Sequence, residues 1–424
     1  MNFTMTLTCD VCDQDIDCRV GMSNRSVQPL SFACPHCSAL IYLTLTIGKG
    51  FAFKGVRQNK ERQYGLFDGR NPFVDLHLDF PVRFGEYIPG NTPFMVAMSM
   101  IDGDGDQRFA RYNFHNMRLA QLNYFHEKSH EIRTILRLYS GKNKQLFVKR
   151  VAQFLNVELG ASLKPEDVNA ALYLFLSHVF LPFVHHPSVK VVVEQFTMLM
   201  MNLARQKRQA FDSFVDYFIG TNFLYVVQKD CLDLYPEIYD AELALRPALF
   251  LDFLKDYERN KVAARVSSRD FVAYKDLYKD IAEVYGRQLV LVAAVNNIVH
   301  RGDYNCFAKP ENGNALSSID KFAANTLSDK FKYLDNCWYE IDGAVVDTAV
   351  RNSIAHFTAK YDEVSQTITY FPEKEGVRQE KGEVMFFIDF MRMILLLFRE
   401  VHYLHHLIKS LFYYEYLIKN KARV

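Results

Sequence analysis

Two cysteine motifs near the start of the 424-residue chain constrain its fold more than any other feature of the sequence. The first motif pairs Cys9 with Cys12, and the second pairs Cys34 with Cys37. A Cys-x-x-Cys turn presents two thiolates from one tight loop, and two such turns supply the four ligands of a tetrahedral Zn²⁺ ion. Because all four ligands come from the protein, we predict a closed, structural zinc site in a ribbon over residues 1–47.

Disulfide pairing of the same cysteines is the alternative to metal binding. Asp10, Asp13 and Asp15 stand where a secretory signal would need an apolar run, and structural disulfides are typical of secreted proteins. No apolar stretch approaches the ~20 residues that a membrane-spanning helix needs. We therefore expect a cytoplasmic protein that binds zinc and has no membrane segment.

Length and charge limit the remaining possibilities. A chain of 424 residues is too long for one hydrophobic core, so we expect two or three domains. The formal net charge is +1, so no overall basic field attracts nucleic acid. Any RNA binding must come from local clusters of cations, although such clusters are most often solvated surface. The candidate clusters are 142–150, 205–208 and 419–423.

The segment after the ribbon differs in character from the rest of the chain. Prolines and glycines interrupt short aromatic-rich runs from Phe51 to about Phe125, which is typical of β-hairpins. Residues 48–127 are therefore predicted to form a β-rich unit packed with the ribbon. The run Asp102-Gly-Asp104-Gly-Asp106 lacks the glycine and the glutamate that a calcium loop requires, so we interpret it as a turn.

Beyond His126 the spacing of apolar residues becomes helical and indicates a mainly α protein. We predict a helical middle domain at 128–265, in which Pro165 starts one helix, and a helical C-terminal domain at 266–424. The alternating run from Gln366 to Phe371 predicts one hairpin strand within the C-terminal domain.

The last helix is predicted from about Val384 to Leu417, with apolar residues at every third or fourth place. Such a seam packs inside a bundle or across a dimer, and the spacing allows both. Three histidines lie off the seam, so we expect them at the surface or at an interface rather than as metal ligands: His402, His405 and His406.

The sequence Arg351-Asn352-Ser353-Ile354-Ala355-His356 carries the strongest indication of chemistry. A guanidinium binds phosphate oxygens in a bidentate fork, and an imidazole moves protons near neutral pH. With RNA bound, His356 would take the proton of a 2′-hydroxyl or protonate the leaving 5′-oxygen, while Arg351 holds the charge on phosphorus and Asn352 orients the group by hydrogen bonding. No metal is needed. The alternative is that Arg351 and Asn352 cap or solvate a helix end and that His356 is a hydrogen-bonded histidine.

Helical geometry sets a condition on this site. Arg351 and His356 are five residues apart, which separates them by about 140° around an ideal helix. Either the helix unwinds at His356, or a second copy related by two-fold symmetry completes the site. We favour the second copy, and therefore a homodimer.

The motif and its helical surroundings resemble the HEPN ribonucleases of prokaryotic toxin–antitoxin, abortive-infection and CRISPR systems. The resemblance covers about the last third of the chain. It implies a small helical bundle that dimerises, with two motifs in one cleft, and metal-independent RNA cleavage that leaves a 2′,3′-cyclic phosphate. It also implies antiviral growth arrest, with a viral trigger protein or an antitoxin as partner.

A second stretch, Val295-Asn296-Asn297-Ile298-Val299-His300, matches the motif in its Asn, Ile and His, but Val295 replaces the arginine. It is either a degenerate echo of the motif or a coincidence. The leading hypothesis is thus a dimeric endoribonuclease in which the ribbon senses or docks. The competing hypothesis is a non-enzymatic zinc-ribbon adaptor or nucleic-acid-binding regulator with a dimerising helical domain.

Overall fold

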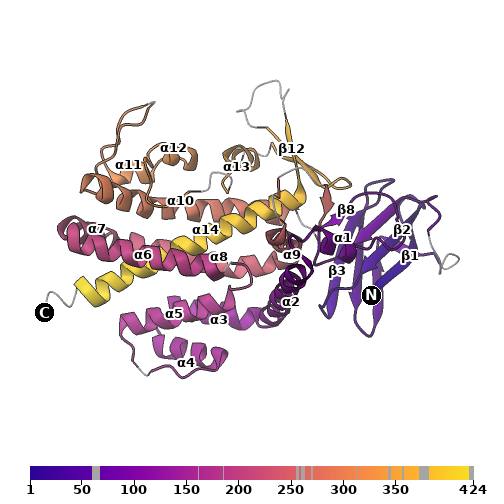
Figure 1. Cartoon of the computed structure of the whole chain (residues 1–424), viewed down its shortest axis with the longest axis horizontal. Helices are drawn as coiled ribbons and strands as arrows, with labels where there is room; N and C mark the ends of the chain where they lie inside the picture. The colour runs from indigo at the N-terminus through magenta and orange to yellow at the C-terminus, as the bar shows by residue number, and fades with distance from the viewer. Residues whose placement is uncertain are drawn as a thin grey trace. The chain divides into compact units, whose positions relative to one another are not determined.

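The protein is mainly α-helical, and its N-terminal segment forms small β-sheets (Figure 1). The computed structural model describes residues 1–424 except 60–66, 161, 185, 255–256, 259–262, 269–270, 312, 342–344, 356–357, 372–381 and 420–424. The described residues form fourteen α-helices and twelve β-strands. None of the helices in this part of the chain is both long and apolar enough to cross a membrane.

Two sheets are formed by the first 76 residues (Figure 1). One has the order β6-β1-β2-β7 and the other the order β3-β4-β5. The alternating run from Leu40 to Ile47, which follows the second cysteine motif and predicts a strand, forms β4. The bounds are β1 (Asn2–Cys9), β2 (Asp15–Gly21), β3 (Val27–Ala33), β4 (Leu40–Thr46), β5 (Gly50–Lys54), β6 (Val56–Gln58) and β7 (Phe73–Leu76).

Apolar residues of both sheets form one hydrophobic core. Leu7 and Ile16 come from the first sheet, Phe32 and Leu43 come from the second, and all four are fully buried. The chain passes from one sheet to the other at Gly55, which has φ +80° and whose added Cβ would lie 2.8 Å from the Leu40 carbonyl oxygen. Only glycine tolerates both the left-handed backbone and this close approach.

The prediction of a β-rich unit over 48–127 is wrong for its second half. After β8 (Val82–Arg83) the chain forms α1 (Pro93–Met100) and α2 (Gly105–Glu127). Thr92 caps α1 by accepting a hydrogen bond from the Met95 amide, and Pro93 occupies the first turn, where its missing N–H costs nothing. Asp104 caps α2 by accepting from the Gln107 amide at 3.0 Å, so the acidic turn starts a helix.

Two compact units make up the chain, and each unit takes three separate segments. Unit 1 contains 1–124, 240–276 and 349–395, and unit 2 contains 125–239, 277–348 and 396–424. The predicted domains 128–265 and 266–424 therefore do not coincide with the units. The reason is that α10 (Phe271–Arg301) and α14 (Phe387–Tyr413) each contribute residues to both.

Unit 2 is helical, and its long helices meet around buried polar side chains. Gln288 on α10 donates to the Cys231 sulfur on α8 at 3.1 Å and to the Val401 carbonyl on α14 at 2.9 Å. The predicted helix start at Pro165 is confirmed. The remaining helices that contribute to unit 2 are α3 (Ser129–Ser140), α4 (Lys144–Leu155), α5 (Pro165–Val179), α6 (His186–Gln206), α7 (Arg208–Gly220), α8 (Phe223–Asp240), α11 (Ile319–Ala323) and α12 (Leu327–Phe331).

Besides the two sheets and the helices α1 and α2, unit 1 contains two short helices, a small hairpin sheet and a strand pair. The hairpin sheet has the order β10-β11-β12, and β9 (Ala264–Arg265) pairs with β8. The predicted strand from Gln366 is confirmed as β11, whereas Val384, predicted as helix, belongs to β12. The bounds are α9 (Glu242–Phe250), α13 (Thr348–Ala355), β10 (Lys360–Asp362), β11 (Thr367–Tyr370) and β12 (Glu383–Phe386).

A buried ionic cluster holds α9 to the N-terminal segment inside unit 1. The Arg246 side chain is fully buried and contacts Asp79 at 2.8 Å and the Glu242 carboxylate. Arg25 contacts the same Glu242 at 2.7 Å. Burial alone would raise the pKa of Asp79, but the Arg246 guanidinium and the His77 ring lower it below its ordinary value.

Candidate functional site

The four predicted cysteine ligands lie together at the ends of two hairpins of unit 1. Cys9 ends β1 and Cys34 follows β3, so each motif forms the turn of its hairpin. The two turns have the same backbone geometry. Asp13 donates its amide to the Cys9 carbonyl at 3.0 Å with φ +54°, and Ser38 donates to the Cys34 carbonyl at 2.9 Å with φ +62°.

The distances between the sulfur atoms fit a bound cation and not a disulfide. The Sγ atoms of the four cysteines all lie within 4.8 Å of one another, and the distances Cys9–Cys37 and Cys12–Cys34 are both 3.8 Å. A disulfide bond would need about 2.05 Å. A tetrahedral ion with metal–sulfur bonds of about 2.3 Å places its ligand sulfurs about 3.8 Å apart. The four cysteines can therefore hold a metal ion.

The four cysteines differ in their burial. Cys9 and Cys34 are buried, Cys12 is half-buried and Cys37 is exposed. Burial raises the pKa of Cys34 to about 12, and a bound cation would favour the thiolate form of that side chain. No other group of His, Cys, Asp or Glu side chains in the described part of the chain has this geometry.

The predicted catalytic residues fall on α13 in unit 1, apart from one. Val350 and Ile354 are buried, whereas Asn352 is exposed and Arg351 is half-buried. The Arg351 guanidinium lies 3.5 Å from the Asn352 amide oxygen, so the ends of these two side chains approach each other although the residues are about 100° apart around the helix. His356 lies outside the described residues, and its distance from Arg351 stays untested.

α13 is described as far as Ala355, and His356 follows directly outside the described residues. The Ser353 carbonyl accepts hydrogen bonds from the amides of Thr358 at 2.9 Å and Ala359 at 3.3 Å. The separation of about 140° between Arg351 and His356 applies to a regular helix that continues through both. Both predicted arrangements, an unwound helix and a symmetric second copy, therefore remain open.

Ser353 fixes the motif helix to the hairpin sheet. Its hydroxyl accepts from the Phe371 amide at 3.0 Å and donates to the Phe371 carbonyl at 2.7 Å, and the residue is buried. Phe371 directly follows β11. A polar residue inside the predicted motif thus has a structural function that the sequence did not indicate.

A second set of hydrogen bonds joins the hairpin sheet to the sheet of β3, which leads into the Cys34 turn. Gln366 is buried with φ +51°, and it exchanges two hydrogen bonds with the Val266 backbone at 2.8 and 3.0 Å. The next residue, Ser267, accepts the Ser31 amide of β3 at 2.7 Å. Residues from α13 to the Cys34 turn are therefore linked through hydrogen bonds inside unit 1. The sequence did not reveal these contacts of Gln366 and Ser267, because no local pattern predicts a glutamine with a left-handed backbone conformation.

The predicted echo of the motif forms a structural network in unit 2. Asn296 donates to the Asp335 carbonyl at 2.9 Å, and His300 contacts the Asn336 carbonyl at 3.0 Å. Arg301 binds the Asp335 carboxylate at 2.8 and 3.0 Å. Asn296 is fully buried, so these side chains hold the 335–336 loop against the end of α10.

The prediction that the three histidines of the last helix lie at a surface or an interface is wrong. His402, His405 and His406 are all buried, because no residue of α14 is exposed and the helix has no solvent face. The Tyr235 hydroxyl lies 2.9 Å from Nδ1 of His402 and 3.0 Å from Nδ1 of His405. Burial and Lys409 lower the pKa of His402 to about 4, so the ring is neutral at physiological pH.

The predicted basic clusters are partly used inside the protein. Lys207 donates to the carbonyls of Ile298 and Val299 at 2.9 and 2.7 Å, at the C-terminal end of α10. Lys419 is buried beside Asp216 and Glu415, and residues 420–423 lie outside the described part. The cluster at 142–150 lies around α4, where Lys144 donates to the Tyr139 carbonyl.

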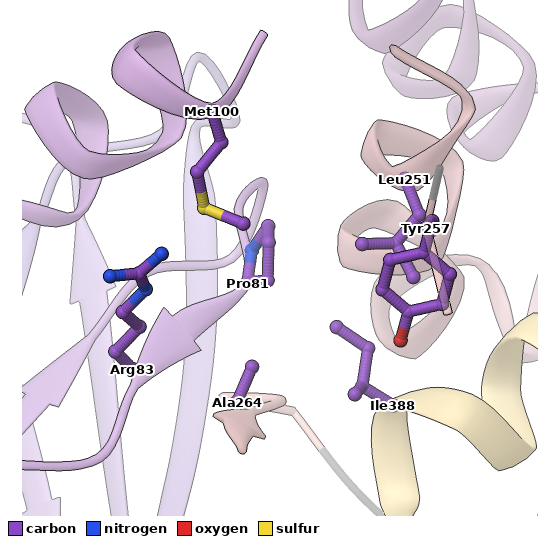
Figure 2. Close-up of a pocket in the computed structure, with 7 residues that line it drawn as sticks. All are labelled: Pro81, Arg83, Met100, Leu251, Tyr257, Ala264 and Ile388. Atoms are coloured by element: carbon purple, nitrogen blue, oxygen red, sulfur yellow. The ribbon is translucent and has the colours of Figure 1, made fainter. Parts of the chain in front are cut away.

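A small cavity in unit 1 does not provide a substrate site. Its volume is about 10 Å³, which is room for about one water molecule. Figure 2 shows Arg83, Pro81 and Met100 on one side and Tyr257, Leu251 and Ile388 on the other. The Tyr257 hydroxyl donates to Asp389 at 2.5 Å, so its hydrogen bond is already satisfied.

No match to this chain was found among protein-family models, curated proteins or solved structures.

Proposed function

We propose that the protein is a metal-independent endoribonuclease in which Arg351 binds the scissile phosphate, Asn352 orients it and His356 transfers the proton. The observation that supports the proposal most is the 3.5 Å contact between the Arg351 guanidinium and the Asn352 amide oxygen on α13, with the apolar residues Val350 and Ile354 facing the core. A guanidinium and an amide whose ends lie this close can contact two oxygens of the same phosphate.

The cysteine cluster is proposed to hold a structural Zn²⁺ ion. Four sulfur ligands and the tetrahedral spacing favour zinc over harder cations, which prefer oxygen. Because the motif helix and the cluster belong to unit 1 and are joined through Ser353, Gln366 and Ser267, the ion stabilises the unit that carries the motif. The ion takes no part in the chemistry.

In this proposal the active form is a cytoplasmic homodimer of a prokaryotic defence or toxin system, silent until a viral component or the loss of an antitoxin releases it. This part rests on the resemblance to HEPN ribonucleases alone. The competing function is a zinc-ribbon adaptor or nucleic-acid-binding regulator. The cysteine cluster favours this alternative, because a structural metal site has a role in a binding protein that performs no catalysis.

The test compares RNA cleavage by the wild-type protein with that by Arg351→Ala and His356→Ala. Arg70→Ala serves as the matched control, because Arg70 is an exposed arginine of unit 1 that pairs with nearby Asp68. The reaction is run in metal-free buffer without a chelator, since a chelator would also remove the ion from the cysteine cluster. Cleavage by wild type and Arg70→Ala, and its loss by about 10²-fold or more in the other two variants, supports the enzyme.

Latent activity is examined in cells by expressing the same four proteins and measuring growth. Growth arrest that Arg351→Ala and His356→Ala relieve and Arg70→Ala does not relieve supports a triggered nuclease. Equal behaviour of all four proteins in both assays refutes the nuclease and favours the adaptor.

Mixing the two variant proteins tests whether the Arg351 and His356 of one site come from the same subunit or from different subunits. If Arg351 and His356 of different subunits form one site, each mixed dimer of Arg351→Ala and His356→Ala regains one complete site. If both groups come from one chain, the mixture stays inactive.

A further inference from the structure

The outward face of the hairpin β4–β5 is exposed, although its residues alternate like those of a half-buried strand. Ile41, Leu43 and Leu45 point inward and are buried. Leu40 and Tyr42 point outward and are 42% and 43% exposed. The pairing of the strands sets the outward residues opposite one another as Tyr42–Lys54, Thr44–Ala52 and Thr46–Gly50. We call these residues, with Leu40, the β4–β5 face.

Tyr42 is the only aromatic side chain of this face, and a cation lies beside it. The Lys54 ammonium nitrogen is 5.7 Å from the centre of the Tyr42 ring. The next cross-strand pairs are small, Thr44 with Ala52 and Thr46 with Gly50. Tyr42 is 43% exposed beside these small side chains, so part of its ring is accessible to a base, and sheets that bind single-stranded nucleic acid present aromatic residues for stacking.

The charge of the surrounding sequence is of one sign. No aspartate or glutamate occurs between Asp17 and Glu61, a stretch that includes β3, β4 and β5. Lys49 lies in the turn between β4 and β5, and Lys54 ends β5. Among the described residues, neither lysine forms an ion pair with a carboxylate. In the hairpin β1–β2, by contrast, the exposed carboxylates of Asp10 and Asp13 both form ion pairs with Arg57.

We propose that the β4–β5 face binds single-stranded RNA, with one base stacked on Tyr42 and the backbone phosphates beside Lys54 and Lys49. Stacking selects single strands, since the bases of a duplex are not accessible to a side chain. The choice of RNA over other anionic polymers rests on the proposed nuclease function. The face belongs to the same unit as α13, so it would hold the substrate of that nuclease.

Binding is measured by fluorescence anisotropy of a labelled 12-nucleotide oligouridine on the full-length protein carrying Arg351→Ala, which prevents cleavage during the titration. Tyr42→Ala removes the ring, Tyr42→Phe keeps it, and Lys54→Gln removes the charge. Tyr124→Ala is the matched control, because Tyr124 is also an exposed tyrosine of unit 1, with 50% exposure.

We expect Tyr42→Ala to weaken binding by about 5- to 150-fold, the range for loss of one stacked base. Tyr42→Phe and Tyr124→Ala should stay within about 2-fold of the parent, because neither removes a ring from the face. Lys54→Gln should lower the slope of log K against log salt concentration by about 0.7, which corresponds to one phosphate contact on a single strand.

Three results overturn the proposal: no binding of the oligouridine by the parent protein, equal binding of a duplex of the same length, or equal losses for Tyr42→Ala and Tyr124→Ala. These results are distinct from failure of the nuclease. A protein that cleaves RNA equally well with and without Tyr42 contradicts only the binding face. A protein that binds through Tyr42 and never cleaves contradicts only the nuclease.

Discussion

Replacing Cys37 with serine should prevent metal binding by the cysteine cluster and destabilise the sheets whose turns carry the cysteines. Cys37 is exposed, so the substitution changes little packing and acts mainly through the lost ligand. The ion closes the chain between Cys12 and Cys34, which are 22 residues apart. The entropy of closing a loop of that length corresponds to about 3 kcal/mol at 25 °C. The free energy of unfolding of unit 1 should fall by about that amount.

The effect should be local, and hydrogen exchange can localise it. A loss of about 3 kcal/mol increases exchange through unfolding of the sheets by about 100-fold. We expect this increase in peptides from β1 to β4 and in β11, which is linked to them through Gln366. Peptides from α8 and the middle of α10 in unit 2 should change far less. Metal content is measured on the same samples by mass spectrometry of the element.

Cys306→Ser is the matched control, because Cys306 is an exposed cysteine outside the cluster. It should keep one zinc ion per chain and wild-type exchange. The reasoning fails if the wild-type protein purifies without a metal ion, or if Cys37→Ser loses the ion and the exchange of β1 to β4 does not change.

Two further predictions concern buried charge. Arg246→Met leaves the buried carboxylates of Asp79 and Glu242 without their shared cation and should lower the free energy of unfolding, measured by chemical denaturation, by about 3–5 kcal/mol. Arg70→Met, at an exposed ion pair, should lower it by less than about 1 kcal/mol. Similar losses for the two variants would contradict the stabilising role of the buried cluster in unit 1. The pKa of His402 is lowered to about 4 in the fold against about 6.5 in the unfolded chain, so the unfolded state binds more protons between these values. His402 alone should therefore contribute about 2 kcal/mol to the loss of stability from pH 7 to pH 5. Fluorescence of Trp338, the single tryptophan, follows unfolding of unit 2, and a slope that His402→Phe does not reduce would refute the assignment.

The sequence predicted best those features that local chemistry determines. The cysteine spacing predicted four sulfurs in one cluster, and the alternation after the second motif predicted β4, because a tight turn and a half-buried strand are local structures. The start of α5 at Pro165 followed from the same kind of signal.

Features that depend on tertiary packing were not predictable. The aromatic runs before Phe125 are typical of hairpins, but part of this segment is helical. Thr92 caps the start of α1 and Asp104 caps the start of α2, and each helix buries one face. His402 and its neighbours were assigned to a surface because they lie off an apolar seam, yet α14 has no exposed face at all. The same limit explains why Gln366, which links the hairpin sheet to the sheet of β3, could not be recognised.

The most direct measurement of the central claim is the chemistry of the RNA ends that the zinc-loaded protein produces in metal-free buffer. Proton transfer by His356 at a phosphate held by Arg351 predicts fragments with 2′,3′-cyclic phosphate and 5′-hydroxyl ends from the wild-type protein. Arg351→Lys, which keeps the charge and loses the bidentate fork, should produce the same ends far more slowly. Fragments with 5′-phosphate ends, or equal yields from wild type and Arg351→Ala, would contradict the account.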